Sequence, residues 1–216
     1  MGETIDITAS DGHRLQAFIS TPAGAARGGL VVIQTAFGVD AYLRGVCDSF
    51  ARDGYLAIAP ALYDRQRRGA AFEHTPEGGA AAGKMRNGFV WDDVLKDVEA
   101  ARARVAAAGK VGVVGYCVGG SVVWLAAHAL RFAVAASYYG KDVVDFLDRA
   151  PKCPITLHFG DQDRLIPLAD VEKIKAAFPA LPVHVYNAGH GFDGNNPEAA
   201  AIARERTMTL FRAHIG

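Results

Sequence analysis

Continuous apolar runs recur along the chain and are separated by longer segments with helical periodicity. Most of these runs show no alternation of apolar and polar positions, which is typical of parallel strands buried on both faces. They occupy residues 30–34, 55–59, 111–115, 132–138, 155–159 and 183–186. The pattern predicts a strand at each of these places. Before them, residues 3–8 and 14–20 flank the turn sequence Ser10-Asp11-Gly12 and predict an antiparallel hairpin.

Apolar side chains spaced three or four residues apart predict helices between these strands. The positions are Leu43, Val46, Cys47 and Phe50; Val94, Val98, Ala101 and Val105; Val171, Ile174 and Phe178; and Ala203, Thr207, Leu210 and Phe211, in a last helix that starts near Pro197. Another helical run covers residues 121–130. Strands that alternate with helices predict an α/β fold, with a mostly parallel central sheet and helices on both faces.

The length of 216 residues, with no internal repeat and no linker, predicts a single domain over residues 1–216. The least regular part is residues 64–88, which has a basic start and is rich in glycine and alanine. We expect this stretch to be a lid or a mobile loop.

Composition and charge exclude several classes of function. The 23 Lys and Arg balance the 23 Asp and Glu, so there is no strong field to attract nucleic acid or an acidic membrane. We find neither a signal-peptide pattern nor an apolar run long enough to span a membrane. The three cysteines argue against a disulfide framework. We therefore expect a cytoplasmic protein with free thiols and with no nucleic-acid or membrane partner.

The sequence Gly115-Tyr116-Cys117-Val118-Gly119 lies between a predicted strand and a predicted helix. Gly-x-Cys-x-Gly at such a junction predicts a sharp turn that presents the central side chain above the sheet. The helix N-terminus would favour the thiolate of Cys117 and lower its pKa. The N–H group of Val118 would point at a developing oxyanion. The alternative interpretation is a packed core cysteine in a glycine-rich turn.

A nucleophile at such a turn requires an acid and then a histidine, each following a later strand. Asp161 and Asp163 both follow the strand at 155–159, and His190 follows the strand at 183–186 between two glycines. Of the two acids we favour Asp163, because Pro167 would fix its loop. Its carboxylate would hold the imidazole tautomer and stabilise the imidazolium. The alternative for His190 is a solvated loop residue.

With these motifs, the sequence resembles the dienelactone hydrolase family, which is the carboxymethylenebutenolidase-like cysteine branch of the α/β-hydrolase fold. The likeness spans most of the chain, and its anchors are residues 115–120, 37–39, 53–55, 62–63, 138–140, 159–167 and 188–192. The resemblance implies an α/β-hydrolase fold and a triad of Cys117, Asp163 and His190. It also implies an oxyanion hole made by the backbone N–H groups of Ala36 and Val118.

Two departures from the family pattern concern the substrate. Thr35 stands where the dienelactone enzymes have a glutamate that helps to activate the thiol. The arginine expected shortly after the catalytic histidine is missing from residues 191–194. Lys84 and Arg86 are possible substitutes for a second arginine, from the lid stretch. Candidate substrate-binding residues are Thr35, Phe37, Tyr63, Arg86, Trp91 and Tyr138.

These features predict a cysteine-dependent hydrolase that cleaves an ester or lactone through a thioester acyl-enzyme, with a substrate other than dienelactone. The partner would be a small-molecule ester or lactone, and the protein a monomer or small homo-oligomer. We expect no cofactor and no metal, since no His, Cys, Asp and Glu set has metal-ligand spacing. The alternative is a catalytically impaired binding or regulatory protein, or a redox-sensing one, on the same fold.

Overall fold

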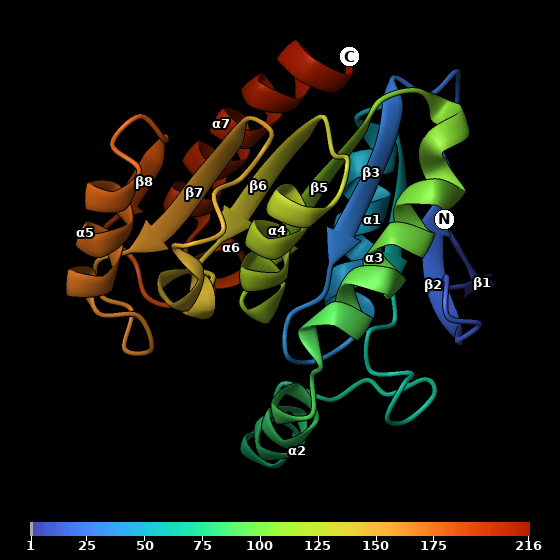
Figure 1. The fold of residues 1–216 in the computed structure, drawn as a ribbon, viewed down its shortest axis with the longest axis horizontal. Coiled ribbons are helices and arrows are strands. Elements are labelled where there is room, and N and C mark those ends of the chain that lie inside the picture. The colour runs from blue at the N-terminus through green and yellow to red at the C-terminus, as the bar shows by residue number, and fades with distance from the viewer. Residues whose placement is uncertain (1) are drawn as a thin grey trace.

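Eight strands form one mixed sheet in the computed structural model, which describes residues 2–216 (Figure 1). Their order across the sheet is β1-β2-β4-β3-β5-β6-β7-β8. The strands are β1 (Glu3–Thr8), β2 (Arg14–Ser20), β3 (Gly28–Ile33), β4 (Tyr55–Pro60), β5 (Val111–Tyr116), β6 (Val134–Tyr138), β7 (Ile155–Gly160) and β8 (Val183–Tyr186). The β1–β2 and β2–β4 pairs are antiparallel, and all other pairs are parallel. The predicted hairpin and the six further strands are confirmed.

Helices cover both faces of this sheet, as predicted. The helices are α1 (Ala41–Arg52), α2 (Pro76–Asn87), α3 (Trp91–Val105), α4 (Val118–Ala129), α5 (Leu168–Ala177), α6 (Phe192–Asn195) and α7 (Pro197–Ile215). Two short 3-10 turns are η1 (Ala106–Ala108) and η2 (Lys141–Phe146). Figure 1 shows α3, α4 and α5 on the near face and α1 and α7 on the far face.

The central strands are buried on both faces, which explains their unbroken apolar sequences. Every residue of β3 and β5 is buried, and β5 runs directly into α4 at the carboxyl edge of the sheet. In open α/β sheets, ligands bind in crevices between the loops beyond the carboxyl ends of the strands. The turn between β5 and α4 is therefore placed where a site is expected.

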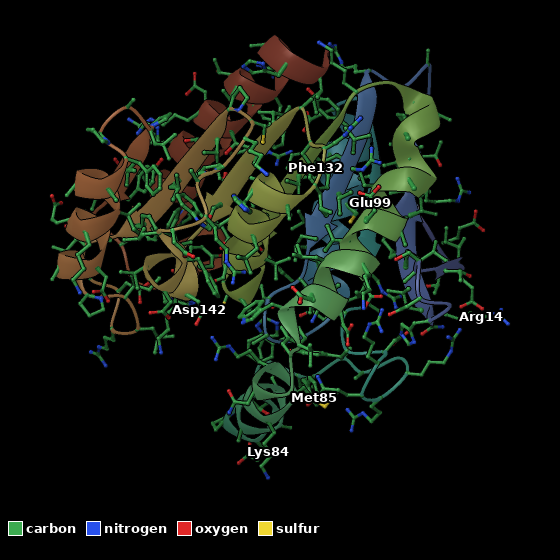
Figure 2. The ribbon with its side chains drawn as sticks, viewed as in Figure 1. Arg14, Lys84, Met85, Glu99, Phe132 and Asp142 are labelled. Carbon is green, nitrogen blue, oxygen red and sulfur yellow. The ribbon has the colours of Figure 1, made fainter. Side chains whose placement is uncertain are left out.

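Of the two alternatives for residues 64–88, a lid or a mobile loop, the mobile loop is wrong for the second half, which forms α2. Thr75 caps the helix by accepting the N–H of Gly78, and proline occupies the first turn. Of its side chains, Ala82 is buried, so the amphipathic pattern that would have predicted a helix is absent. The helix extends beyond the carboxyl edge of the sheet, and Lys84 lies on its outer side (Figure 2).

A membrane-spanning helix is not found within residues 2–216, since no helix there is both long and apolar enough.

Candidate active site

Cys117 occupies a strained turn between β5 and α4. Its φ is 57° and its ψ is −119°, a conformation that L-residues rarely adopt. The neighbouring glycines permit the turn because other backbone lies against them. A Cβ atom added to Gly115 would lie 2.3 Å from the carbonyl oxygen of Gly119. A Cβ atom added to Gly119 would lie 2.5 Å from the carbonyl oxygen of Gln34. The spacing of these glycines is thus dictated by close backbone contacts.

Backbone hydrogen bonds hold this turn on the sheet edge. The N–H of Cys117 donates to the carbonyl of Tyr138 at 3.1 Å, and the N–H of Gly120 donates to the carbonyl of Cys117 at 2.9 Å. The Cys117 side chain is half-buried and lies at the N-terminus of α4. The side chain is thus presented at the positive end of the α4 dipole.

His190 and Asp163 are joined by a hydrogen bond of 2.7 Å between Nδ1 and Oδ2. Oδ1 of Asp163 accepts the N–H groups of Leu165 and Ile166, at 2.8 and 3.2 Å, so the carboxylate is fixed in its loop. Asp161, the alternative acid, accepts the N–H of Ala188 at 3.2 Å instead. The structure therefore places Asp163, and not Asp161, against the imidazole.

The electrostatics of this pair favour an imidazolium. Burial acts to lower the pKa of His190, but the hydrogen bond to Asp163 and the contact with Cys117 outweigh it and raise the pKa to about 9. Burial acts to raise the pKa of Asp163, but the bond from His190 and the two N–H groups hold that pKa below its ordinary value. Asp163 therefore stays ionised when His190 carries a proton.

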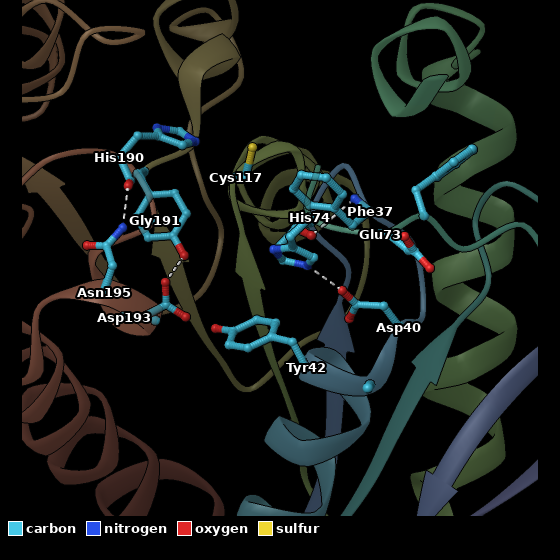
Figure 3. A pocket seen from close by; sticks show the side chains of 15 residues that line it. Phe37, Asp40, Tyr42, Glu73, His74, Cys117, His190, Gly191, Asp193 and Asn195 are labelled. Carbon is cyan, nitrogen blue, oxygen red and sulfur yellow. Dashed lines mark hydrogen bonds and ion pairs between the residues drawn. The ribbon is translucent and has the colours of Figure 1, made fainter. Parts of the chain in front are cut away.

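Nε2 of His190 is buried and has no hydrogen-bond partner in the part of the chain that the structure describes. Since Nδ1 is taken by Asp163, this nitrogen is free to exchange a proton with a reacting group. His190 and Cys117 both border one cavity, as Figure 3 shows. An imidazole that faces a cysteine across a cavity has the arrangement that nucleophilic catalysis needs.

This cavity has a volume of about 760 Å³, which is ample for a small-molecule substrate. It is bordered by residues from the β3–α1 loop, the loop after β4, the β5–α4 turn, the end of β6 and the loop with α6. They are Thr35, Phe37, Asp40, Ala41, Tyr42, Phe72, Glu73, His74, Cys117, Tyr139, His190, Gly191, Asp193, Gly194 and Asn195.

The β3–α1 loop places Thr35, Ala36 and Phe37 beside the cysteine turn. Thr35 borders the cavity, but its hydroxyl accepts the N–H of Phe37 at 3.2 Å and so supports the loop. The carbonyl of Ala36 accepts the hydroxyl of Tyr63 at 2.8 Å. Burial raises the pKa of Tyr63, which keeps its hydroxyl protonated as a donor.

Of the six predicted substrate-binding residues, Thr35 and Phe37 border the cavity and the other four have different surroundings. Tyr63 is fully buried beneath the loop of Ala36. Arg86 is bonded to Asp142 on η2, and Trp91 packs edge-on against Phe146 at 5.4 Å.

Tyr138, the fourth of these residues, does not border the cavity, but the next residue, Tyr139, does. The hydroxyl of Tyr138 is bonded to Thr207 within the core, at 2.8 Å. Tyr139, with a φ of 37°, turns into the cavity instead. Since β6 ends at Tyr138, the positive φ of Tyr139 turns the chain at the edge of the sheet, and the next ring meets the cavity instead of the core.

The cavity also contains a second His–Asp pair that the sequence analysis did not find. Nε2 of His74 and Oδ2 of Asp40 are 2.6 Å apart, and the His74 ring stacks on Phe37 with centroids 3.9 Å apart. The His74 side chain is 55% exposed. Since 34 residues separate the partners, no local pattern in the sequence could have found this pair.

Within the described residues, no group of three or more His, Cys, Asp or Glu side chains is arranged to hold a metal ion.

Comparison with known proteins agrees with this geometry. The model of the dienelactone hydrolase family matches residues 15–215. A carboxymethylenebutenolidase of Pseudomonas putida is 36% identical over 222 residues, covering 95% of this chain and 94% of that protein. A crystal structure from Klebsiella pneumoniae, assigned to the dienelactone hydrolases, superimposes with a TM-score of 0.84 at 27% identity, over 97% of this chain and 99% of that one. An esterase of Pyrococcus furiosus, at 14% identity and a TM-score of 0.76, covers 100% of this chain and 92% of its own and shares the fold.

Proposed function

Since the chain belongs to the dienelactone hydrolase family, whose members hydrolyse lactone or ester bonds, we propose that it does so through a triad of Cys117, His190 and Asp163. One observation carries this proposal. The imidazole of His190 is fixed by Asp163 on one side, and its other nitrogen is unpaired beside the cavity that Cys117 borders. This arrangement supports His190 as the group that exchanges protons and Cys117 as the nucleophile.

In the first half of the reaction, the Cys117 thiolate attacks the carbonyl carbon of the substrate and forms a C–S bond. The carbonyl oxygen becomes an oxyanion, which the N–H groups of Val118 and Ala36 stabilise. The C–O bond then breaks, and the leaving alkoxide takes the proton from Nε2 of His190. A thioester on Cys117 and a neutral imidazole remain.

In the second half, the neutral imidazole takes a proton from water as the water oxygen attacks the thioester carbonyl. The C–S bond of the resulting tetrahedral intermediate breaks, which releases the carboxylic acid and restores the thiolate and the imidazolium. Asp163 stabilises the imidazolium in both halves without accepting its proton. Because the pKa of His190 is raised to about 9, its imidazole carries at neutral pH the proton that the leaving alkoxide needs.

Replacing Cys117 by Ala tests this function with small para-nitrophenyl esters as substrates. We expect turnover to fall to the background rate while the melting temperature is kept. Rapid mixing of the parent with ester, followed by acid quench and mass spectrometry, should detect one acyl group on Cys117. The matched control is Cys153→Ala, because burial raises the pKa of that thiol to about 11. Equal turnover in Cys117→Ala and parent would refute the triad.

The redox-sensing alternative gives a different result in the same experiment. A sensing thiol would be oxidised by peroxide without accumulating an acyl group, and its removal would leave ester turnover unchanged. Detection of the acyl group therefore separates the two functions.

A further inference from the structure

The cavity that Cys117 borders has carboxylates in its wall besides the proposed triad. Three carboxylates border it, from Asp40, Glu73 and Asp193, whereas none of its bordering residues within 2–216 is lysine or arginine. Asp40 is already bonded to His74. Asp193 differs, because no ion pair to it is found among the described residues.

Tyr139 connects Asp193 to the proposed catalytic imidazole. Asp193 lies on α6, three residues after His190, and one of its oxygens accepts the hydroxyl of Tyr139. The Tyr139 ring packs edge-on against His190, with centroids 4.8 Å apart. Figure 3 shows the Asp193 carboxylate at the wall of the cavity, on the same side as His190. A substrate that reaches Cys117 from this cavity therefore passes close to Asp193.

Two arginines beside this region are paired with other carboxylates. Arg204 borders a neighbouring cavity together with Asp193, and its guanidinium donates to Asp53 at 2.5 Å. Arg86 is bonded to Asp142, and Cys117 is a further group that raises its pKa, but Arg86 does not border the cavity of Cys117. Neither arginine is therefore in the wall against which a substrate would lie.

We propose that Asp193 is the specificity-determining residue of this cavity, which accepts esters or lactones with a neutral or cationic acyl group and rejects those that carry a carboxylate. The inference rests on the proposed function, because it takes the cavity of Cys117 as the place of ester cleavage. A substrate carboxylate beside Asp193 would bring two negative charges together, with no lysine or arginine among the residues that border the cavity. At a separation of several ångströms in a partly buried site, this repulsion disfavours the anionic substrate by at least about tenfold.

Three para-nitrophenyl esters with the same leaving group test the proposal. They are the monoester of glutaric acid, which is anionic, its methyl ester, which is neutral, and the ester of trimethylammoniobutyric acid, which is cationic. The assay is run at pH 8, above the value of about 7 to which burial raises the pKa of Asp193. For the parent, we expect kcat/KM of the anionic ester to be at least about tenfold below those of the other two.

Asp193→Asn and Asp193→Ser should bring the anionic and neutral esters to within about threefold of each other. Asn keeps an acceptor for Tyr139, and Ser provides a second, smaller replacement; melting curves show whether each variant is folded. The matched control is Asp148→Asn, an exposed carboxylate on a surface turn, which should keep the ratio of the parent.

Equal kcat/KM for the anionic and neutral esters in the parent would overturn the proposal, whether or not the variants fold. An unchanged ratio in a folded Asp193 variant would overturn it as well. Cys117→Ala, assayed on the neutral ester, keeps this result separate from the proposed function. If that variant loses turnover while the ratio does not respond to Asp193, the substrate class is wrong and the triad stands. If Cys117→Ala keeps turnover, the proposed function itself fails.

Discussion

The hydroxyl of Tyr63 donates to the carbonyl oxygen of Ala36 at 2.8 Å, from a fully buried ring beneath the loop. Peptide planarity ties this carbonyl to the N–H of Phe37, which donates to the Thr35 hydroxyl, whereas the N–H of Ala36 is linked to it through two rotatable bonds. The bond from Tyr63 therefore holds the loop that carries the Ala36 N–H rather than that N–H directly. Tyr63 is thus a positioning residue for one of the two proposed oxyanion donors.

Tyr63→Phe should lower kcat on a neutral para-nitrophenyl ester by about tenfold, less than the 100-fold or more typical of losing a donor entirely. KM should change little, because Tyr63 does not border the cavity. The loss of the hydrogen bond should also reduce the free energy of unfolding by about 1 kcal/mol. Steady-state kinetics and urea denaturation measure the two effects.

Tyr55→Phe is the matched control for this prediction. The hydroxyl of Tyr55 also donates to a backbone carbonyl at 2.8 Å, that of Gly216, at the chain's end. The two variants should lose comparable stability, but only Tyr63→Phe should lose kcat. A similar kcat in both would show that Tyr63 has a structural role alone.

The elevated pKa of His190 leads to a prediction about pH. Because the pKa of His190 is raised from 6.5 to about 9, the positive charge of the imidazolium and its ion pair with Asp163 persist through neutral pH and are lost as pH rises through 9, while the Nδ1–H bond to Asp163 remains. We expect kcat/KM to decline above about pH 9. The contribution of this ion pair to stability should be complete below about pH 6.5 and lost through the same alkaline range.

Asp163→Asn should move this alkaline decline to lower pH and reduce kcat by roughly a thousandfold, because the amide no longer stabilises the imidazolium. The matched control is Asp161→Asn, which alters a carboxylate two residues away that accepts the N–H of Ala188. Its pH profile should overlay that of the parent. An alkaline limb at the same pH in Asp163→Asn would contradict the assignment of the raised pKa to the His190–Asp163 pair.

The sequence predicted those parts of the molecule that local constraints determine. The strand pattern is visible because β3 and β5 are buried on both faces and contain no polar position. The cysteine turn is visible because Gly115 and Gly119 each lie against backbone that leaves no room for a side chain. His190 and Asp163 follow from the order of the strands, since both lie just beyond the carboxyl end of one.

The two polar pairs that border the cavity outside the proposed triad were not predictable, because each joins segments that are distant in the sequence. Asp40 meets His74 across 34 residues, and Tyr139 meets Asp193 across 54. The short α6 that presents Asp193 has four residues, too few for a periodic pattern. The residue that we propose to select the substrate, Asp193, therefore lies in a segment that local sequence patterns do not predict.

Gly119→Ala should destabilise the fold and disturb the cysteine turn together. A Cβ at this position would lie 2.5 Å from the carbonyl oxygen of Gln34 and 2.7 Å from that of Ile33, so β3 and α4 must move apart. We expect a loss of about 2–3 kcal/mol in the free energy of unfolding, seen as a lower melting temperature, and a lower kcat because the Val118 N–H is displaced. The matched control is Gly45→Ala in α1, where a Cβ meets nothing within 4 Å. That variant should be unchanged or more stable by about 0.5–1 kcal/mol, because alanine favours helix. Equal melting temperatures for the two variants would show that the contact between β3 and α4 is looser than the structure indicates.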